Sequence, residues 1–104
     1  MTYGDKLDVI IDHYGVRNQL KKLNEESYEL IEAIRDYEEQ KQACEFIGCK
    51  EPHVDKCREH ITEEIADCYV MLEQFRIRYD ISLEKIKEVG AYKIDRQLER
   101  ISKE

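Results

Sequence analysis

The sequence has 104 residues, a length typical of one small domain. Charged residues make up 39% of it and the formal net charge is -7, which disfavours the phosphate backbone of a nucleic acid as a partner. No apolar run approaches the roughly 20 residues of a membrane-spanning helix, and the N-terminus lacks a signal-peptide pattern. We therefore expect one cytoplasmic domain over residues 1–104 that binds neither nucleic acid polymers nor membranes.

The apolar spacing of the first half predicts two helices. Leu7, Ile11 and Tyr14 recur at helical intervals and Gly15 follows, so a short helix is expected over 3–14. A long helix is expected over about 17–44. Its apolar positions step by three and four, with Ser27 filling the remaining place, which is typical of bundle packing: Leu20, Leu23, Leu30, Ile34 and Tyr37.

The second half predicts two more helices after a Cys-containing loop over about 45–54, where Gly48 and Pro52 lie. The third helix is expected over about 55–79. Ser82 is the expected N-cap of a fourth helix, whose apolar residues run from Leu83 to Ile101. The fold class is therefore all-α, a four-helix bundle-like chain, and so small a core suggests completion by oligomerisation.

Two carboxylates of the third helix lie where a core face is expected. On a helical wheel centred on Cys68, Glu64 falls about 40° from the centre and Asp67 about 60° further round, on the same turn. Glu63 and Glu73 more nearly lie opposite the core, where a surface helix normally places its acids. Because an isolated buried carboxylate is costly, Glu64 should protonate, pair or bind a metal.

The second helix repeats this arrangement. Glu26 and Glu29 lie on one flank of its apolar stripe and share a turn, together with Gln19, Lys22 and Ala33. Two acid pairs that lean towards one interhelical seam call for a shared cation. Carboxylate oxygens favour a hard ion, Mg²⁺ or Mn²⁺, which keeps positions open for water and phosphates. The alternative is that each pair is simply solvated, as in many Glu-rich helices.

The fourth helix carries the complementary charge. Lys93, Arg96 and Arg100 lie along one edge of its apolar stripe, where they could hold phosphates. The alternative interpretation is a basic C-terminal turn that complements the helix dipole.

Together, these motifs resemble those of the MazG-like, all-α nucleoside triphosphate pyrophosphohydrolases. That family carries EExxE on one helix and ExxD on a later one. Here they read Glu25-Glu26-Ser27-Tyr28-Glu29 and Glu64-Ile65-Ala66-Asp67. Gln19 and Lys22 precede the first motif, and Lys93 and Arg96 look like the family's late basic pair. The resemblance covers roughly residues 17–100.

The resemblance implies Mg²⁺-dependent hydrolysis of a nucleoside triphosphate, often a deoxynucleotide, to the monophosphate and pyrophosphate, as nucleotide-pool housekeeping. It implies a homodimer or homotetramer in which a second chain can contribute to the active site. By position it implies four metal ligands, Glu26, Glu29, Glu64 and Asp67. Glu25 would be catalytic beside Glu64, as a base that orients water or a ligand of a second ion. The implied substrate-binding residues are Gln19, Lys22, Lys93 and Arg96.

One spacing departs from the family pattern, because the 34 residues between Glu29 and Glu64 exceed the usual gap. The excess falls in a stretch where Cys and His residues crowd together: Cys44, Cys49, His53, Cys57 and His60. Buried or reduced thiols are the favoured interpretation there, with a structural Zn²⁺ clip as the alternative. Cys68 is expected to be a small buried apolar residue.

Two other functions remain open at this point. Apolar helical spacing and high charge fit a non-catalytic helical interaction module equally well. Within the enzyme class, a related pyrophosphohydrolase could act on a phosphoribosyl nucleotide instead of a nucleoside triphosphate.

Overall fold

The computed structural model describes residues 1–48 and 52–104, and within them every regular element is a helix. In chain order these are α1 (Tyr3–Tyr14), α2 (Val16–Ile47), α3 (Pro52–Arg78) and α4 (Leu83–Ser102). The all-α prediction is confirmed. No helix of the described part is long and apolar enough to cross a membrane.

Local capping chemistry explains where the helices begin and end. Thr2 caps α1 through a capping box with Asp5. Gly15 has φ 87° and serves at once as the C-cap of α1 and the N-cap of α2, a backbone conformation that favours glycine. The Ser82 side chain accepts a hydrogen bond from the Lys85 backbone N–H at the start of α4, which confirms the predicted N-cap.

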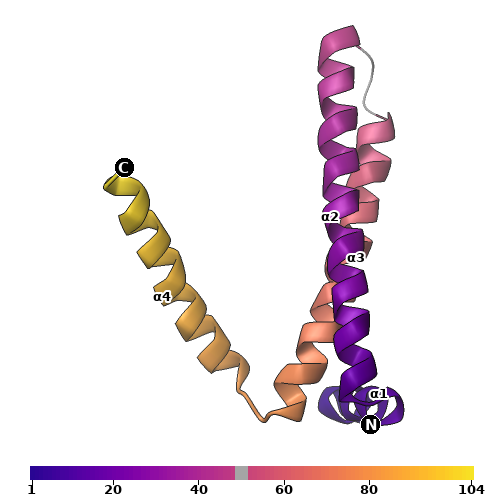
Figure 1. Cartoon of the computed structure of the whole chain (residues 1–104), viewed down its shortest axis with the longest axis vertical. Helices are drawn as coiled ribbons and strands as arrows, with labels where there is room; N and C mark the ends of the chain where they lie inside the picture. The colour runs from indigo at the N-terminus through magenta and orange to yellow at the C-terminus, as the bar shows by residue number, and fades with distance from the viewer. Residues whose placement is uncertain (49–51) are drawn as a thin grey trace.

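Helices α2 and α3 lie side by side and form a long hairpin (Figure 1). Both helices are longer than the sequence predicted, because α2 continues to Ile47 and α3 begins at Pro52. The predicted 45–54 loop is thereby shortened from both sides, and residues 49–51 lie outside the described part. Gly48 ends α2 in the left-handed conformation.

Helix α1 packs across the open end of this hairpin, where α2 begins and α3 ends (Figure 1). Its apolar side is buried through Leu7 and Ile11. Two polar contacts fix it to α3: the Tyr3 hydroxyl donates to Glu73 at 2.7 Å, and Arg78 pairs with Asp12 at 3.0 Å. These three helices form the packed part of the chain.

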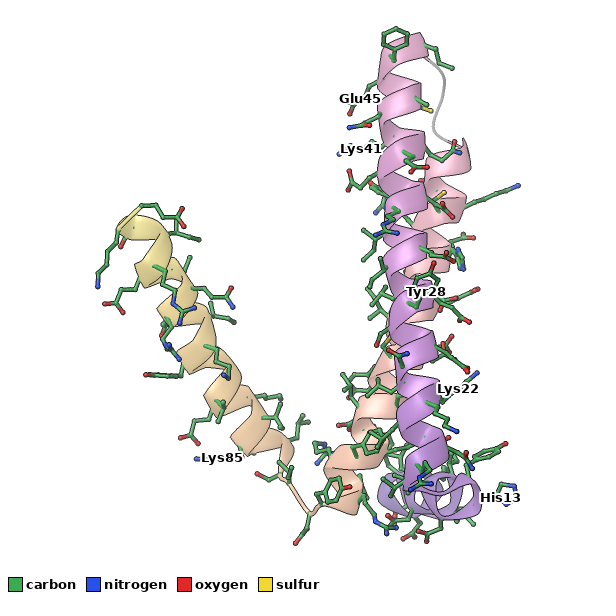
Figure 2. The ribbon with its side chains drawn as sticks, in the orientation of Figure 1. His13, Lys22, Tyr28, Lys41, Glu45 and Lys85 are labelled. Atoms are coloured by element: carbon green, nitrogen blue, oxygen red, sulfur yellow. The ribbon has the colours of Figure 1, made fainter. Side chains whose placement is uncertain are left out.

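Helix α4 leaves this unit and points away from it (Figures 1 and 2). None of its residues is buried, and its predicted core positions are open to solvent, with Ile94, Leu98 and Ile101 about 60% exposed. A single chain therefore does not close into the predicted four-helix bundle, because the fourth helix contributes no side chain to the core.

The face that α2 buries also differs from the predicted one. Leu20 and Ile34 of the predicted stripe are exposed, whereas the buried residues of α2 are Gln19, Glu26 and Ala33. These three lie seven residues apart, on the flank of the stripe. The two long helices thus meet along a line that mixes polar and apolar residues, and part of each apolar stripe remains on the surface.

Candidate metal centre

The seam between α2 and α3 contains a cluster of three carboxylates. Glu26 comes from α2, and Glu64 and Asp67, three residues apart, come from one turn of α3. One carboxylate oxygen from each residue lies within 4.8 Å of the other two. The rigid helices set this geometry, because the buried i, i+7 line of α2 faces α3 and the i, i+3 spacing aligns the α3 pair.

The two glutamates of this cluster are buried and incompletely paired. Glu26 is 6% exposed and Glu64 is 8% exposed. In each of them the Oε2 atom is buried and has no hydrogen-bond partner. A buried, unpaired carboxylate oxygen is strongly unfavourable. These residues therefore fit a bound cation, and their oxygen chemistry suits a hard one.

The second oxygen of each glutamate has a protein partner. The Lys22 ammonium lies 3.1 Å from Glu26 Oε1, and this contact raises the pKa of Lys22. His60 Nε2 lies 3.2 Å from Glu64 Oε1, one helical turn away on α3. Each glutamate is thus paired through Oε1 alone.

Negative charge is crowded around this cluster. The charge of Glu26, followed by partial desolvation and the charge of Glu64, raises the pKa of Glu29. Burial and the charges of Glu26 and Glu64 raise the pKa of the neighbouring Cys68 thiol, which therefore stays protonated at neutral pH. The three residues of the cluster itself offer carboxylate oxygens, the ligand type that Mg²⁺ prefers.

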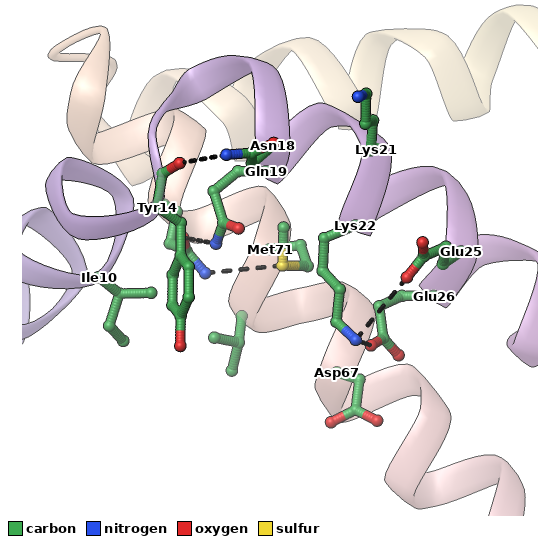
Figure 3. Close-up of a pocket in the computed structure, with 12 residues that line it drawn as sticks. Ile10, Tyr14, Asn18, Gln19, Lys21, Lys22, Glu25, Glu26, Asp67 and Met71 are labelled. Atoms are coloured by element: carbon green, nitrogen blue, oxygen red, sulfur yellow. Dashed lines mark hydrogen bonds and ion pairs between the residues drawn. The ribbon is translucent and has the colours of Figure 1, made fainter.

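A cavity of about 600 Å³ opens beside the cluster (Figure 3). Glu26 and Asp67 lie at one end with Lys21, Lys22 and Glu25. The other end lies against α1 and is lined mainly by apolar and amide side chains: Ile10, Tyr14, Asn18, Gln19, Val70, Met71 and Gln74. One cavity therefore joins a charged region to an apolar one.

Two glutamines form a buried pair in the wall of this cavity. Gln19 Nε2 donates to Gln74 Oε1 at 2.7 Å, and the Gln74 amide contacts the Met71 sulfur at 3.6 Å. Sequence reasoning missed Gln74, which is only 2% exposed. The available signal was its spacing, because Gln74 lies seven residues after Asp67 and three after Met71, on the cluster's side of α3.

The predicted site residues fall into three groups. Glu26, Glu64 and Asp67 come together. Glu25 and Glu29 are exposed beside them, and Glu25, Gln19 and Lys22 line the cavity. Lys93 and Arg96 lie on α4 in a separate basic patch with Gln97 and Arg100, around a hollow of about 180 Å³. A single chain does not bring this patch to the carboxylates, because α4 diverges from the hairpin (Figure 1).

The cysteine segment differs from expectation in part. Cys57 is a free thiol, and Cys68 is a free thiol that is half-buried instead of fully buried. Cys44 is disulfide-bonded, which corrects the expectation of reduced thiols at that position. The disulfide removes Cys44 from the predicted Zn²⁺ clip, because zinc binds thiolates. Cys49 and the side chain of His53 lie outside the described residues, so the rest of the clip stays a prediction. His60 instead contacts the carboxylate cluster.

No protein-family model, curated protein or solved structure matches this chain. Its resemblance to the MazG-like pyrophosphohydrolases therefore rests on the two acidic motifs and their neighbours in the sequence.

Proposed function

We propose that this protein is a Mg²⁺-dependent nucleoside triphosphate pyrophosphohydrolase of the MazG-like kind. The observation that carries the proposal is the cluster of Glu26, Glu64 and Asp67. It has three oxygens within 4.8 Å and two buried oxygens without partners. A set of carboxylate oxygens suits Mg²⁺ or Mn²⁺, and such an ion is normally completed by water and substrate phosphates.

The shape of the adjoining cavity supports an organic phosphate as the ligand. Its volume of about 600 Å³ is in the range of small-molecule sites. A polyphosphate fits the end where Lys22 lies, and a nucleoside fits the end where Tyr14 and Met71 lie. Inorganic polyphosphate alone would leave the apolar end unused.

The chain's own groups supply the remaining parts of a hydrolytic site. Glu26, Glu64 and Asp67 would hold the ion, which when bound neutralises phosphate charge and helps to activate water. The exposed Glu25 carboxylate beside the cluster is placed to accept a proton from the attacking water. Lys22 is placed to contact phosphate oxygens from the cavity wall.

The decisive experiment measures pyrophosphate release from a panel of ribo- and deoxynucleoside triphosphates and phosphoribosyl nucleotides, with Mg²⁺ and with EDTA. Release that requires Mg²⁺ and is lost in Glu64→Gln is the expected result. Glu63→Gln is the matched control, because Glu63 is the exposed neighbour of Glu64 and lies outside the cluster. A folded wild-type protein that releases no pyrophosphate from any member of the panel would overturn the proposal.

That negative result would favour a helical interaction module, the second candidate function. The observation in its favour is the large apolar surface on α2, α3 and α4. It includes Leu20 and Ile34, Ile65 and Leu72, and Ile86, Ile94 and Leu98. Isolated apolar residues on a surface are ordinary, but stripes that follow helical spacing mark interfaces.

Both functions agree with a second copy of this chain covering these stripes, and we propose a homo-oligomer. In the enzyme, oligomerisation also accounts for Lys93 and Arg96. Both residues lie on α4, which points away from the carboxylate cluster of the same chain. A role in phosphate binding therefore requires the cluster of another chain.

Mixing inactive subunits tests this arrangement. Glu64→Gln lacks a working carboxylate cluster and Arg96→Ala lacks the predicted phosphate contact. If the sites are shared in a symmetric dimer, randomly exchanged subunits regain about a quarter of wild-type activity. Mixtures of Glu64→Gln with Asp67→Asn, both in one cluster, should regain none. Equal recovery in both mixtures, or in neither, would contradict a shared site.

A further inference from the structure

Lys22 is the lysine that pairs directly with the carboxylate cluster in the described part of the chain. Its ammonium lies 3.1 Å from Glu26 Oε1 and 3.9 Å from Glu25 Oε2, so it neutralises part of the carboxylate cluster (Figure 3). No other lysine or arginine of the described residues has an ion pair with Glu26, Glu64 or Asp67. Lys21, its neighbour, lines the same cavity without such a contact.

A lysine in this place and a divalent cation would compete for the same carboxylate. Glu26 Oε1 is paired with Lys22, whereas Glu26 Oε2 and Glu64 Oε2 are buried without a partner. Two positive charges close to one carboxylate repel each other, and the repulsion is stronger at a partly buried site than in water. Binding of the divalent cation therefore weakens the hold of Glu26 on the ammonium.

The Lys22 side chain has room to move away from Glu26 into the adjoining cavity. It is half-exposed, in contrast to the buried Glu26 with which it pairs. It stands on a flexible four-carbon stem and lines the cavity in which we place the polyphosphate. A rotation of the side chain would move the charge from the carboxylate to the cavity without any movement of the backbone.

We propose that Lys22 is the resident countercation of the carboxylate cluster, released from Glu26 when a divalent cation binds and then available to a phosphate in the cavity. The second half of this proposal rests on the proposed function, and the first half does not. The consequence is a coupling between the two ligands, in which a bound ion strengthens the binding of phosphate. The lysine thus has opposite effects on the two ligands.

The first measurement is the affinity for Mn²⁺ alone, by isothermal titration calorimetry without nucleotide. Lys22→Met removes the competing charge and should tighten Mn²⁺ binding about two- to fivefold, the range expected for one partly exposed ion pair. Lys21→Met, which alters the charge of the chain equally, should leave the affinity unchanged. Lys22→Arg keeps the charge and should stay close to the wild-type affinity.

The second measurement is the binding of inorganic tripolyphosphate at saturating Mn²⁺. Here Lys22→Met should weaken binding about tenfold, because a charge-assisted contact to phosphate is lost. A lysine with a merely structural role would not move the two affinities in opposite directions. Circular dichroism of each variant establishes that it is folded.

Each part of the proposal has its own contrary outcome. Mn²⁺ affinity in Lys22→Met that equals or falls below the wild-type value overturns the countercation role. Tighter Mn²⁺ with unchanged tripolyphosphate binding overturns the transfer to phosphate. Failure of the proposed function would instead appear as wild-type protein that releases no pyrophosphate from any nucleotide, while the Mn²⁺ result still decides the role of Lys22.

Discussion

Two buried glutamates on α3 lie in contrasting surroundings. Glu73, near the end of the helix, is 5% exposed; it pairs with Arg76 and accepts a hydrogen bond from Tyr3 of α1. Glu64, nine residues earlier, is 8% exposed and has one oxygen with no partner. Its carboxylate neighbours are Glu26 and Asp67, which add charge of the same sign.

The difference separates a carboxylate that is fully paired within the protein from one that is not. The pairing of Glu73 lowers its pKa through Arg76, then through Tyr3, so its charge contributes to folding. The unpaired oxygen of Glu64 costs folding free energy, because it is buried without a hydrogen-bond partner. Where a protein retains such an unpaired buried group, the group is expected to bind a ligand.

The largest expected effect comes from Glu64→Gln. The affinity for Mn²⁺ should fall by more than about 100-fold, beyond the loss typical of outer partners of a metal site. The free energy of unfolding without metal should rise by roughly 1 kcal/mol, because like charges are no longer crowded in the seam. Calorimetric titration and thermal unfolding measure the two changes. Loss of stability together with intact Mn²⁺ binding would show instead that Glu64 stabilises the fold and does not bind the ion.

A smaller effect is expected from His60→Leu, which removes the 3.2 Å contact to Glu64 Oε1. Mn²⁺ affinity should fall about tenfold, because the carboxylate is no longer held in one orientation. His60→Gln can still donate a hydrogen bond and should retain most of the affinity. If both variants bind like wild type, the histidine is not a positioning residue.

Glu73→Gln tests the fully paired glutamate. It removes the ion pair with Arg76 and weakens the contact to Tyr3, so the free energy of unfolding should fall by about 1–2 kcal/mol. This corresponds to a Tm roughly 5–10 °C lower for a domain of this size. Mn²⁺ affinity should not change. A loss of Mn²⁺ binding in this variant would show that the two ends of α3 are coupled.

The smallest effect is the pH dependence of that stability difference. Because the folded pKa of Glu73 lies below its ordinary value of 4.5, its contribution is complete above that pH and disappears as acid protonates it below. The Tm difference between wild type and Glu73→Gln should therefore be constant near neutrality and shrink below pH 4.5. A difference that grows on acidification would contradict the sign of this pKa shift.

The sequence predicted the helices well because their signals are local. Apolar spacing located the first helix at the bounds of α1, and Ser82 was correctly expected to begin the fourth. The predicted outward position of Glu73 was wrong, because α1 packs across that end of the hairpin and brings Tyr3 to it. A contact between residues 70 positions apart has no periodic signature on one helix.

The predicted core faces illustrate a second limit. Helical spacing on α2 identified its apolar face, yet Leu20 and Ile34 on that face are exposed to solvent. Gln19 and Glu26 are buried instead. An apolar stripe does not specify whether its partner belongs to the same chain. The acid pairs were more informative, because a carboxylate near a core face has few physical explanations, and three of the four acids do lie together.

Gly15, which connects α1 to α2, lies near the apolar end of the cavity and apart from the carboxylates of α3. This residue, with φ 87°, sets the angle at which α1 leaves α2, and Tyr14 and Asn18 on its two sides line the same end of the cavity. A side chain at Gly15 would strain the backbone and alter the width of that end, whereas Glu64 and Asp67 stand on a different helix. Descendants of this chain could therefore remodel what the apolar end accommodates while inheriting the carboxylate chemistry unchanged.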